Sequence, residues 1–70
     1  MFETFYFVAE RTATIRGCTQ DQQELIAVRS DSFRRADRWV NANYPGYFTW
    51  QTVTPKLYLF TATSFASFTA

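Results

Sequence analysis

The sequence contains no histidine, and its 70 residues include only one cysteine, two glycines and two prolines. The side chain that most often transfers protons in catalysis near neutral pH is therefore missing. Cys18 alone can form neither an internal disulfide nor a structural zinc site, and we interpret it as an incidental loop thiol. Gly17 and Gly46 are too few for a phosphate-binding loop. These shortages predict a protein that is not an enzyme and holds no cofactor or metal.

An excess of charge of one sign is also missing. The net charge is +1, whereas a nucleic-acid binder usually carries a basic excess and a DNA mimic an acidic one. The six acidic residues are scattered, and no short spacing places two of them on one buried face. We interpret them as solvated surface acids. They are Glu3, Glu10, Asp21, Glu24, Asp31 and Asp37.

Long apolar runs are absent as well. No stretch approaches the roughly 20 residues that a helix needs to span a bilayer. The first residues, Met1 to Glu3, lack the basic segment of a signal peptide. A single unpaired thiol fits a reducing compartment, so we expect a cytoplasmic protein. The length predicts a single domain over residues 1–70.

Aromatic residues, in contrast, are abundant: eight Phe, four Tyr and two Trp. Large rings bury much apolar area at low entropic cost. One helix cannot cover so many rings, so we expect some of them to face a partner. An uncovered sheet face and a small core together predict a homodimer.

The N-terminal half predicts two strands. Phe2–Ile15 alternates apolar and polar residues with a period of two, which is typical of a strand with one buried face. Arg11 breaks this alternation, which predicts either a bulge or the end of the buried part. Gly17–Gln23 is predicted as a polar loop. Leu25–Arg29 is the second predicted strand, with Leu25 and Ala27 facing outward or lying at an edge.

A helix is predicted over Ser32–Asn43. Ser32 is the preferred N-cap and Ser30 the alternative, because either hydroxyl can accept from an unpaired backbone N–H. Pro45 disfavours helical geometry at the residue before it and ends the helix. The apolar stripe consists of Phe33, Ala36, Val40 and Trp39. Its first three members are expected to be buried against Phe5, Phe7, Ile26 and Val28.

Two further strands are predicted after the helix. Tyr47–Val53 alternates and is rich in strand formers, Thr54–Pro55 interrupts it, and Lys56–Thr63 is the fourth predicted strand. Ser64–Ala70 either extends that strand or covers an edge. The predicted fold is therefore α+β, with one helix on a four-stranded antiparallel sheet in the order ββαββ. Pairing within the two hairpins gives a predicted spatial order of 2-1-3-4.

The most distinctive polar cluster lies on the predicted helix. Arg34 and Arg38 are four residues apart and share a face, and Arg35 lies beside them. One interpretation is a solvated face balanced by Asp31 and Asp37. The other is a recognition helix for an acidic protein surface or a phosphate backbone.

Rings on the strands offer a second candidate surface. They can belong to the core, to a dimer or partner interface, or to a stacking platform for single-stranded nucleic acid. Trp, Tyr and Arg dominate interface hot spots. The predicted partner-binding residues are Arg34, Arg35, Arg38, Trp39, Trp50 and Tyr58.

The layout also resembles very small phage-encoded inhibitors, among them several anti-CRISPR proteins and a phage inhibitor of host RNA polymerase. The matching local pattern covers about one third of the chain. It comprises Ile26-x-Val28-x-Ser30-Asp31-Ser32-Phe33-Arg34-Arg35-Ala36, then Trp39, then Tyr44-Pro45-Gly46-Tyr47-Phe48. These inhibitors share no catalytic motif, so the resemblance assigns no functional residue. The acidic helix of some of them is here rich in arginine, which argues against a shared target.

The resemblance implies a non-enzymatic inhibitor that blocks a larger host complex by occupying a protein surface, in the cytoplasm of a bacterial host. The alternatives are a nucleic-acid-binding module that uses the helix arginines and sheet aromatics, and a structural homodimer. Binding to phosphates would weaken steeply with added salt, which distinguishes the first alternative.

Overall fold

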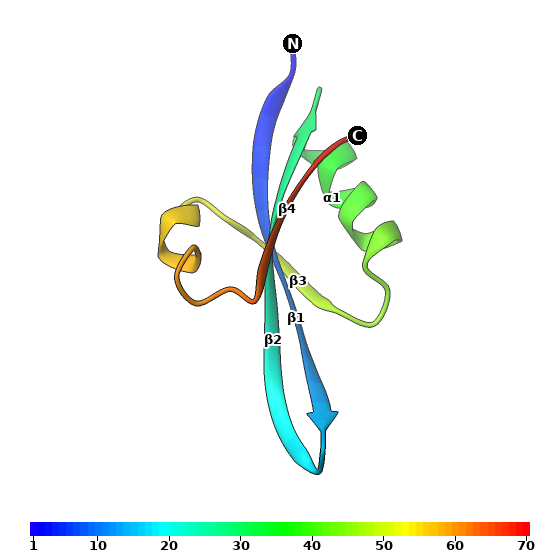
Figure 1. The fold of residues 1–70 in the computed structure, drawn as a ribbon. Helices are drawn as coiled ribbons and strands as arrows, with labels where there is room; N and C mark the ends of the chain where they lie inside the picture. The colour runs from blue at the N-terminus through cyan, green and yellow to red at the C-terminus, as the bar shows by residue number, and fades with distance from the viewer.

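A long β-hairpin runs through the whole structure, a computed structural model that describes residues 1–70 (Figure 1). Strands β1 (Glu3–Ile15) and β2 (Cys18–Ser30) pair antiparallel in unbroken register. The turn between them is Arg16–Gly17, with φ values of 53° and 79°. Two successive positive φ angles are typical of the type I′ turn that suits a twisted hairpin. The predicted loop over Gly17–Gln23 is therefore wrong, because all of it except Gly17 belongs to β2.

The two outer strands complete a four-stranded mixed sheet in the order β3-β1-β2-β4. Strand β3 (Phe48–Thr52) pairs antiparallel with β1, and β4 (Ser64–Thr69) pairs parallel with β2. The α+β class with one helix and the ββαββ order is confirmed. The all-antiparallel sheet and the spatial order 2-1-3-4 are wrong. Strands β3 and β4 form no hairpin, because their connection crosses the sheet and delivers β4 to its far edge.

That connection contains the short 3-10 helix η1 (Pro55–Tyr58). The prediction of a strand over Lys56–Thr63 is therefore wrong. Proline fixes φ at a value that suits the first turn of a helix and donates no ladder hydrogen bond, so Pro55 favours a turn here. The fourth strand instead lies in Ser64–Thr69, within the segment that was predicted either to extend the preceding strand or to cover an edge.

Helix α1 (Phe33–Asn43) confirms the predicted helix, and Ser32 is its N-cap. The Arg35 N–H donates to Ser32 Oγ at 3.2 Å. Ala36 and Val40 are buried as predicted, whereas Phe33 is 42% exposed, so its predicted burial is wrong. Phe33 opens the first turn of α1 and lies at the rim of the packed face. No helix in the structure has both the length and the apolar character required to cross a membrane.

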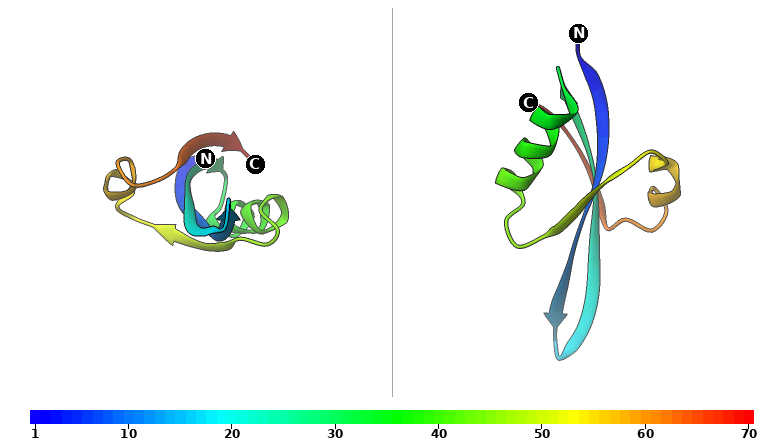
Figure 2. Two further views of the ribbon diagram at one scale, coloured as in Figure 1. Left: turned by 60° about the horizontal axis from the view of Figure 1, so that its bottom comes forward. Right: turned by 180° about the vertical axis from the view of Figure 1, so that it is seen from behind.

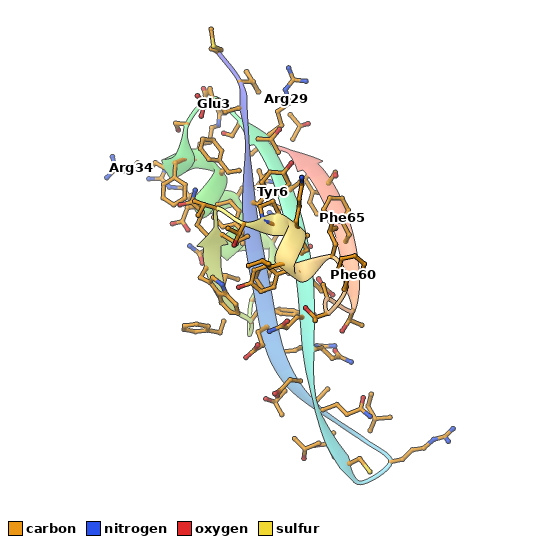
Figure 3. The ribbon with its side chains drawn as sticks, turned by 90° about the vertical axis from the view of Figure 1, so that its left-hand side faces the viewer. Glu3, Tyr6, Arg29, Arg34, Phe60 and Phe65 are labelled. Carbon is orange, nitrogen blue, oxygen red and sulfur yellow. The ribbon has the colours of Figure 1, made fainter.

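The sheet is covered on both faces (Figure 2). Strand alternation turns one set of side chains toward α1, and six buried residues form the core there. They are Phe7, Ala9, Ile26, Val28, Ala36 and Val40. The other face carries Val8, Leu25, Ala27 and Thr52, which are also buried. The β3–β4 connection lies over this second face (Figure 3), so Leu25 and Ala27 are not outward residues.

Beyond the four-stranded part, the hairpin continues alone as a two-stranded arm over residues 11–22 (Figure 1). No bulge occurs at Arg11. It pairs with Gln22 in regular register, and its Nε donates to Gln22 Oε1 at 3.1 Å. The second alternative for Arg11 is therefore confirmed, since the buried part of β1 ends just before it. The arm makes the molecule elongated, with principal extents of 46 × 24 × 15 Å.

Candidate functional site

The three helix arginines lie together on the outer side of α1. With Asp31 and Ser32 they line a shallow surface pocket. Arg35 Nη1 lies 3.2 Å from Asp31 Oδ2, and this pair is exposed, so its contribution to stability is small. Arg34 and Arg38 form no ion pair, and Arg34 extends away from the molecule (Figure 3). Asp31 thus balances one arginine, and the face keeps a local positive charge.

Trp39, in contrast, takes part in packing between the helix and the sheet. Its ring is tilted against Phe68 of β4, with 4.6 Å between the centroids, and the residue is only partly exposed. One edge of Trp39 still lines a shallow pocket beside Arg38 and Ala70. It is therefore adjacent to the arginines but is largely occupied by an intramolecular contact.

Trp50 and Tyr58 lie on the opposite side of the sheet. Trp50 pairs with Val8 across the β1–β3 ladder and therefore shares the face that the β3–β4 connection covers. Its ring lies 5.7 Å from the ring of Phe48. Tyr58 belongs to η1 on the same side. The structure thus divides the six predicted residues between two faces and does not bring them into one site.

A surface that the sequence did not predict lies on the β3–β4 connection and the start of β4. We name it the apolar loop surface. Phe60 is 94% exposed, Val53 87% and Leu57 70%, and Phe60 and Phe65 project from neighbouring parts of it (Figure 3). Lys56 is the only charged residue between Val53 and Ala70. Its members are Val53, Leu57, Leu59, Phe60 and Phe65.

Such a concentration of exposed apolar side chains is informative, because single exposed hydrophobic residues are common but contiguous patches mark interaction sites. A signal for it exists in the sequence. Leu57-Tyr58-Leu59-Phe60 is apolar at four successive positions, whereas a strand with one buried face alternates. Following Pro55, that run indicates a turn that presents apolar side chains in several directions.

A third feature joins the end of α1 to the base of the arm. The rings of Tyr44 and Tyr47 meet edge to face with 5.4 Å between centroids, and Arg11 lies 5.1 Å over the Tyr47 ring. Burial raises the pKa of the Tyr44 phenol above its ordinary value, and the charges of Glu24 and Tyr47 add to this effect. These contacts fix where the chain leaves the helix and enters β3.

The remaining chemically reactive groups are dispersed. Cys18 is exposed at the tip of the arm. The structure gathers no three His, Cys, Asp or Glu residues into a group that could hold a metal ion. Comparison of the chain with protein-family models, with curated proteins and with solved structures gave no match.

Proposed function

We propose that this protein acts by stoichiometric binding to another protein, and that it inhibits a larger bacterial complex by occupying one of its surfaces. The observation that carries the proposal is the apolar loop surface, on which Phe60 is 94%, Val53 87% and Leu57 70% exposed. A folded chain with a second layer over its sheet has no internal use for these side chains. Their burial requires a partner.

Typical interaction free energies favour the apolar loop surface over the helix arginines as the principal contact with the partner. Full burial of a Val, Leu or Phe side chain contributes about 1.5–3 kcal/mol. An exposed pair between an arginine and a carboxylate contributes about 0.2–1 kcal/mol and weakens with salt. We therefore assign affinity to the apolar loop surface, and to Arg34 and Arg38 a role in steering toward an acidic region of the target.

The chemistry of the target follows from this surface. Because Lys56 is the only charge beside Val53 and Leu57, the complementary site is an apolar groove with an acidic group at its rim. The resemblance in size and ββαββ layout to small phage inhibitors supports an inhibitory role and a bacterial target. The scarcity of catalytic side chains supports action by binding rather than by turnover.

The test is affinity capture from a lysate of the native bacterial host, with and without nuclease. Three tagged forms are compared: wild type, Phe60→Asp and the matched control Thr61→Asp. Both positions are exposed, so both variants should retain the fold, which circular dichroism and thermal unfolding verify. We expect one protein to be captured by wild type and by Thr61→Asp, to be lost with Phe60→Asp, and to survive nuclease.

A fourth form, with Arg34, Arg35 and Arg38 all replaced by Glu, separates the two faces. We expect it to capture the same protein with slower association at low salt. Loss of capture with this form alone would place the binding site on the helix. Loss of the captured protein on nuclease treatment would instead indicate a nucleic-acid-binding module. Titration of the purified target should then show inhibition that saturates at an equimolar ratio, and turnover of a substrate would contradict the proposal.

A further inference from the structure

The outer edge of β4 is open and carries none of the usual protection against strand pairing. Edge strands are normally blunted by Lys, Pro, a bulge or an inward charge. Ser64–Thr69 contains no charged residue, proline or glycine and pairs with β2 in regular register. Nothing in the structure pairs with its other side, since β4 is terminal in the strand order.

The hydrogen-bond pattern defines which backbone groups face that open edge. The Ala70 N–H donates to the Arg29 carbonyl at 2.8 Å, so Ala70 directs its N–H toward β2. Backbone direction alternates along a strand. Phe65, Ser67 and Thr69 therefore present their N–H and C=O groups to the outside. Ser67 is the middle one of the three, with Phe65 two positions before it and Thr69 two positions after it.

Because these outward backbone groups can pair with the same groups of a second copy, we propose that two copies of the chain pair β4 against β4 in antiparallel orientation. The two-fold axis passes through Ser67, and the two sheets form a continuous eight-stranded sheet. In this register Ser67 lies opposite Ser67 of the second copy, and Phe65 lies opposite Thr69. Phe68 lies opposite Ala66. Every large ring thus meets a smaller side chain, and no charge meets a like charge. An isologous contact of this kind closes and does not propagate.

A second copy fits this edge better than it fits the other edge of the sheet. On β4, Phe65 and Phe68 lie on opposite faces and both remain substantially exposed. Pairing of two β4 strands would cover apolar rings on both sides of the new ladder. On β3, the face toward α1 carries the polar residues Thr49 and Gln51, and Thr49 is already hydrogen-bonded to Asn41. The proposal is independent of the binding function assigned to the apolar loop surface.

Charge substitution at the two-fold axis provides the test. Ser67→Lys and Ser67→Asp each place two like charges directly opposite one another in the dimer, while the exposed position leaves the monomer fold unaffected. Ser67→Ala is the matched control. Sedimentation equilibrium at micromolar concentration should give twice the 8.2 kDa chain mass for wild type and Ser67→Ala. It should give the monomer mass for each charged variant alone, and the dimer mass for an equimolar mixture of the two.

Restoration in the mixture is specific to this register, because only a Ser67–Ser67 contact turns the repelling Lys–Lys and Asp–Asp pairs into attracting Lys–Asp pairs. A monomeric wild type overturns the proposal. So does a dimer that persists in both charged variants, which would assign self-association to another surface. Phe60→Asp should remain dimeric, so failure of the dimer and failure of the proposed partner binding can be told apart.

Discussion

The ring of Phe33 lies nearly parallel to the ring of Phe7, with 5.9 Å between centroids and 11° between planes. Phe5 meets the same Phe33 ring near its edge, with 5.8 Å between centroids. Phe33 thus covers the end of the core formed by the first strand while keeping its outer side in solvent. Its contribution to stability comes from one ring face rather than from complete burial.

This arrangement predicts different costs for two truncations of the same chemical type. Phe7 is 1% exposed, so Phe7→Ala should lower the free energy of unfolding by about 3–5 kcal/mol. Phe33→Ala should cost about 1–2 kcal/mol, because the solvent-exposed part of its ring makes no packing contact that the truncation could remove. Urea unfolding of the two variants measures both values. Equal losses would show that Phe33 is buried in solution.

The cap of α1 predicts a second effect on stability. Ser32→Ala removes the hydroxyl that accepts from the Arg35 N–H, and it should cost about 1 kcal/mol. Ser32→Asp retains an acceptor and adds a favourable charge at the positive end of the helix, so it should unfold no more easily than wild type. Thermal unfolding compares the three proteins. An unchanged midpoint for Ser32→Ala would contradict the observed cap.

The environment of Tyr44 predicts the response to alkaline pH. Its pKa is raised in the folded protein by burial and by the charge of Glu24, so the unfolded chain ionises first as the pH rises past about 10. The unfolded state then binds fewer protons than the folded state, and the free energy of unfolding falls with increasing pH. Tyr44→Phe should reduce this decline above about pH 10 and leave the neutral-pH dependence unchanged. Urea unfolding across that range measures the difference, and identical slopes would refute it.

The turn at the tip of the arm predicts a local effect. Gly17 has a φ of +79°, so Gly17→Ala should strain the turn by about 1 kcal/mol even though no atom blocks a Cβ there. Arg16→Asn should strengthen the turn, since Asn-Gly is the preferred type I′ sequence. Hydrogen exchange at Ile15 and Cys18, the pair that closes the turn and exchanges backbone hydrogen bonds, should become faster in the first variant and slower in the second. Exchange rates that change in the opposite directions would show that the turn does not determine the stability of the arm.

The parts of the fold that could be predicted are those whose signals lie close together in the sequence. Ser32, the helical spacing of Ala36 and Val40, and Pro45 act within a few residues of one another, and together they placed α1 correctly. The second strand of the arm, over residues 18–22, was missed for a physical reason. Outside the core, backbone pairing and a turn hold this strand in place, so its residues carry no apolar alternation.

The sheet order depends on contacts between segments far apart in the chain, which local pattern cannot specify. Lys56–Thr63 and Ser64–Thr69 both contain aromatic and threonine residues typical of strands, but only Ser64–Thr69 pairs with β2, because Lys56–Thr63 belongs to the connection that crosses the sheet. The candidate site shows the same division. Helical spacing correctly placed Arg34 and Arg38 on one exposed face, whereas the exposure of Phe60 follows from the path of the connection.

The parallel pairing of β4 with β2 also sets an order of events during folding. The β1–β2 hairpin needs only neighbouring residues and can close early, whereas pairing of β4 with β2 must close a long loop that contains the helix, β3 and η1, so we expect it to form later. During that interval the outer backbone of β2 has no partner, beside the apolar side chains of Leu25, Ile26 and Val28. The same vacant position can receive the last strand of another molecule, although the molecule's own strand competes at a higher effective concentration. We expect slow closure of β4 onto β2 to increase strand exchange between molecules at high protein concentration.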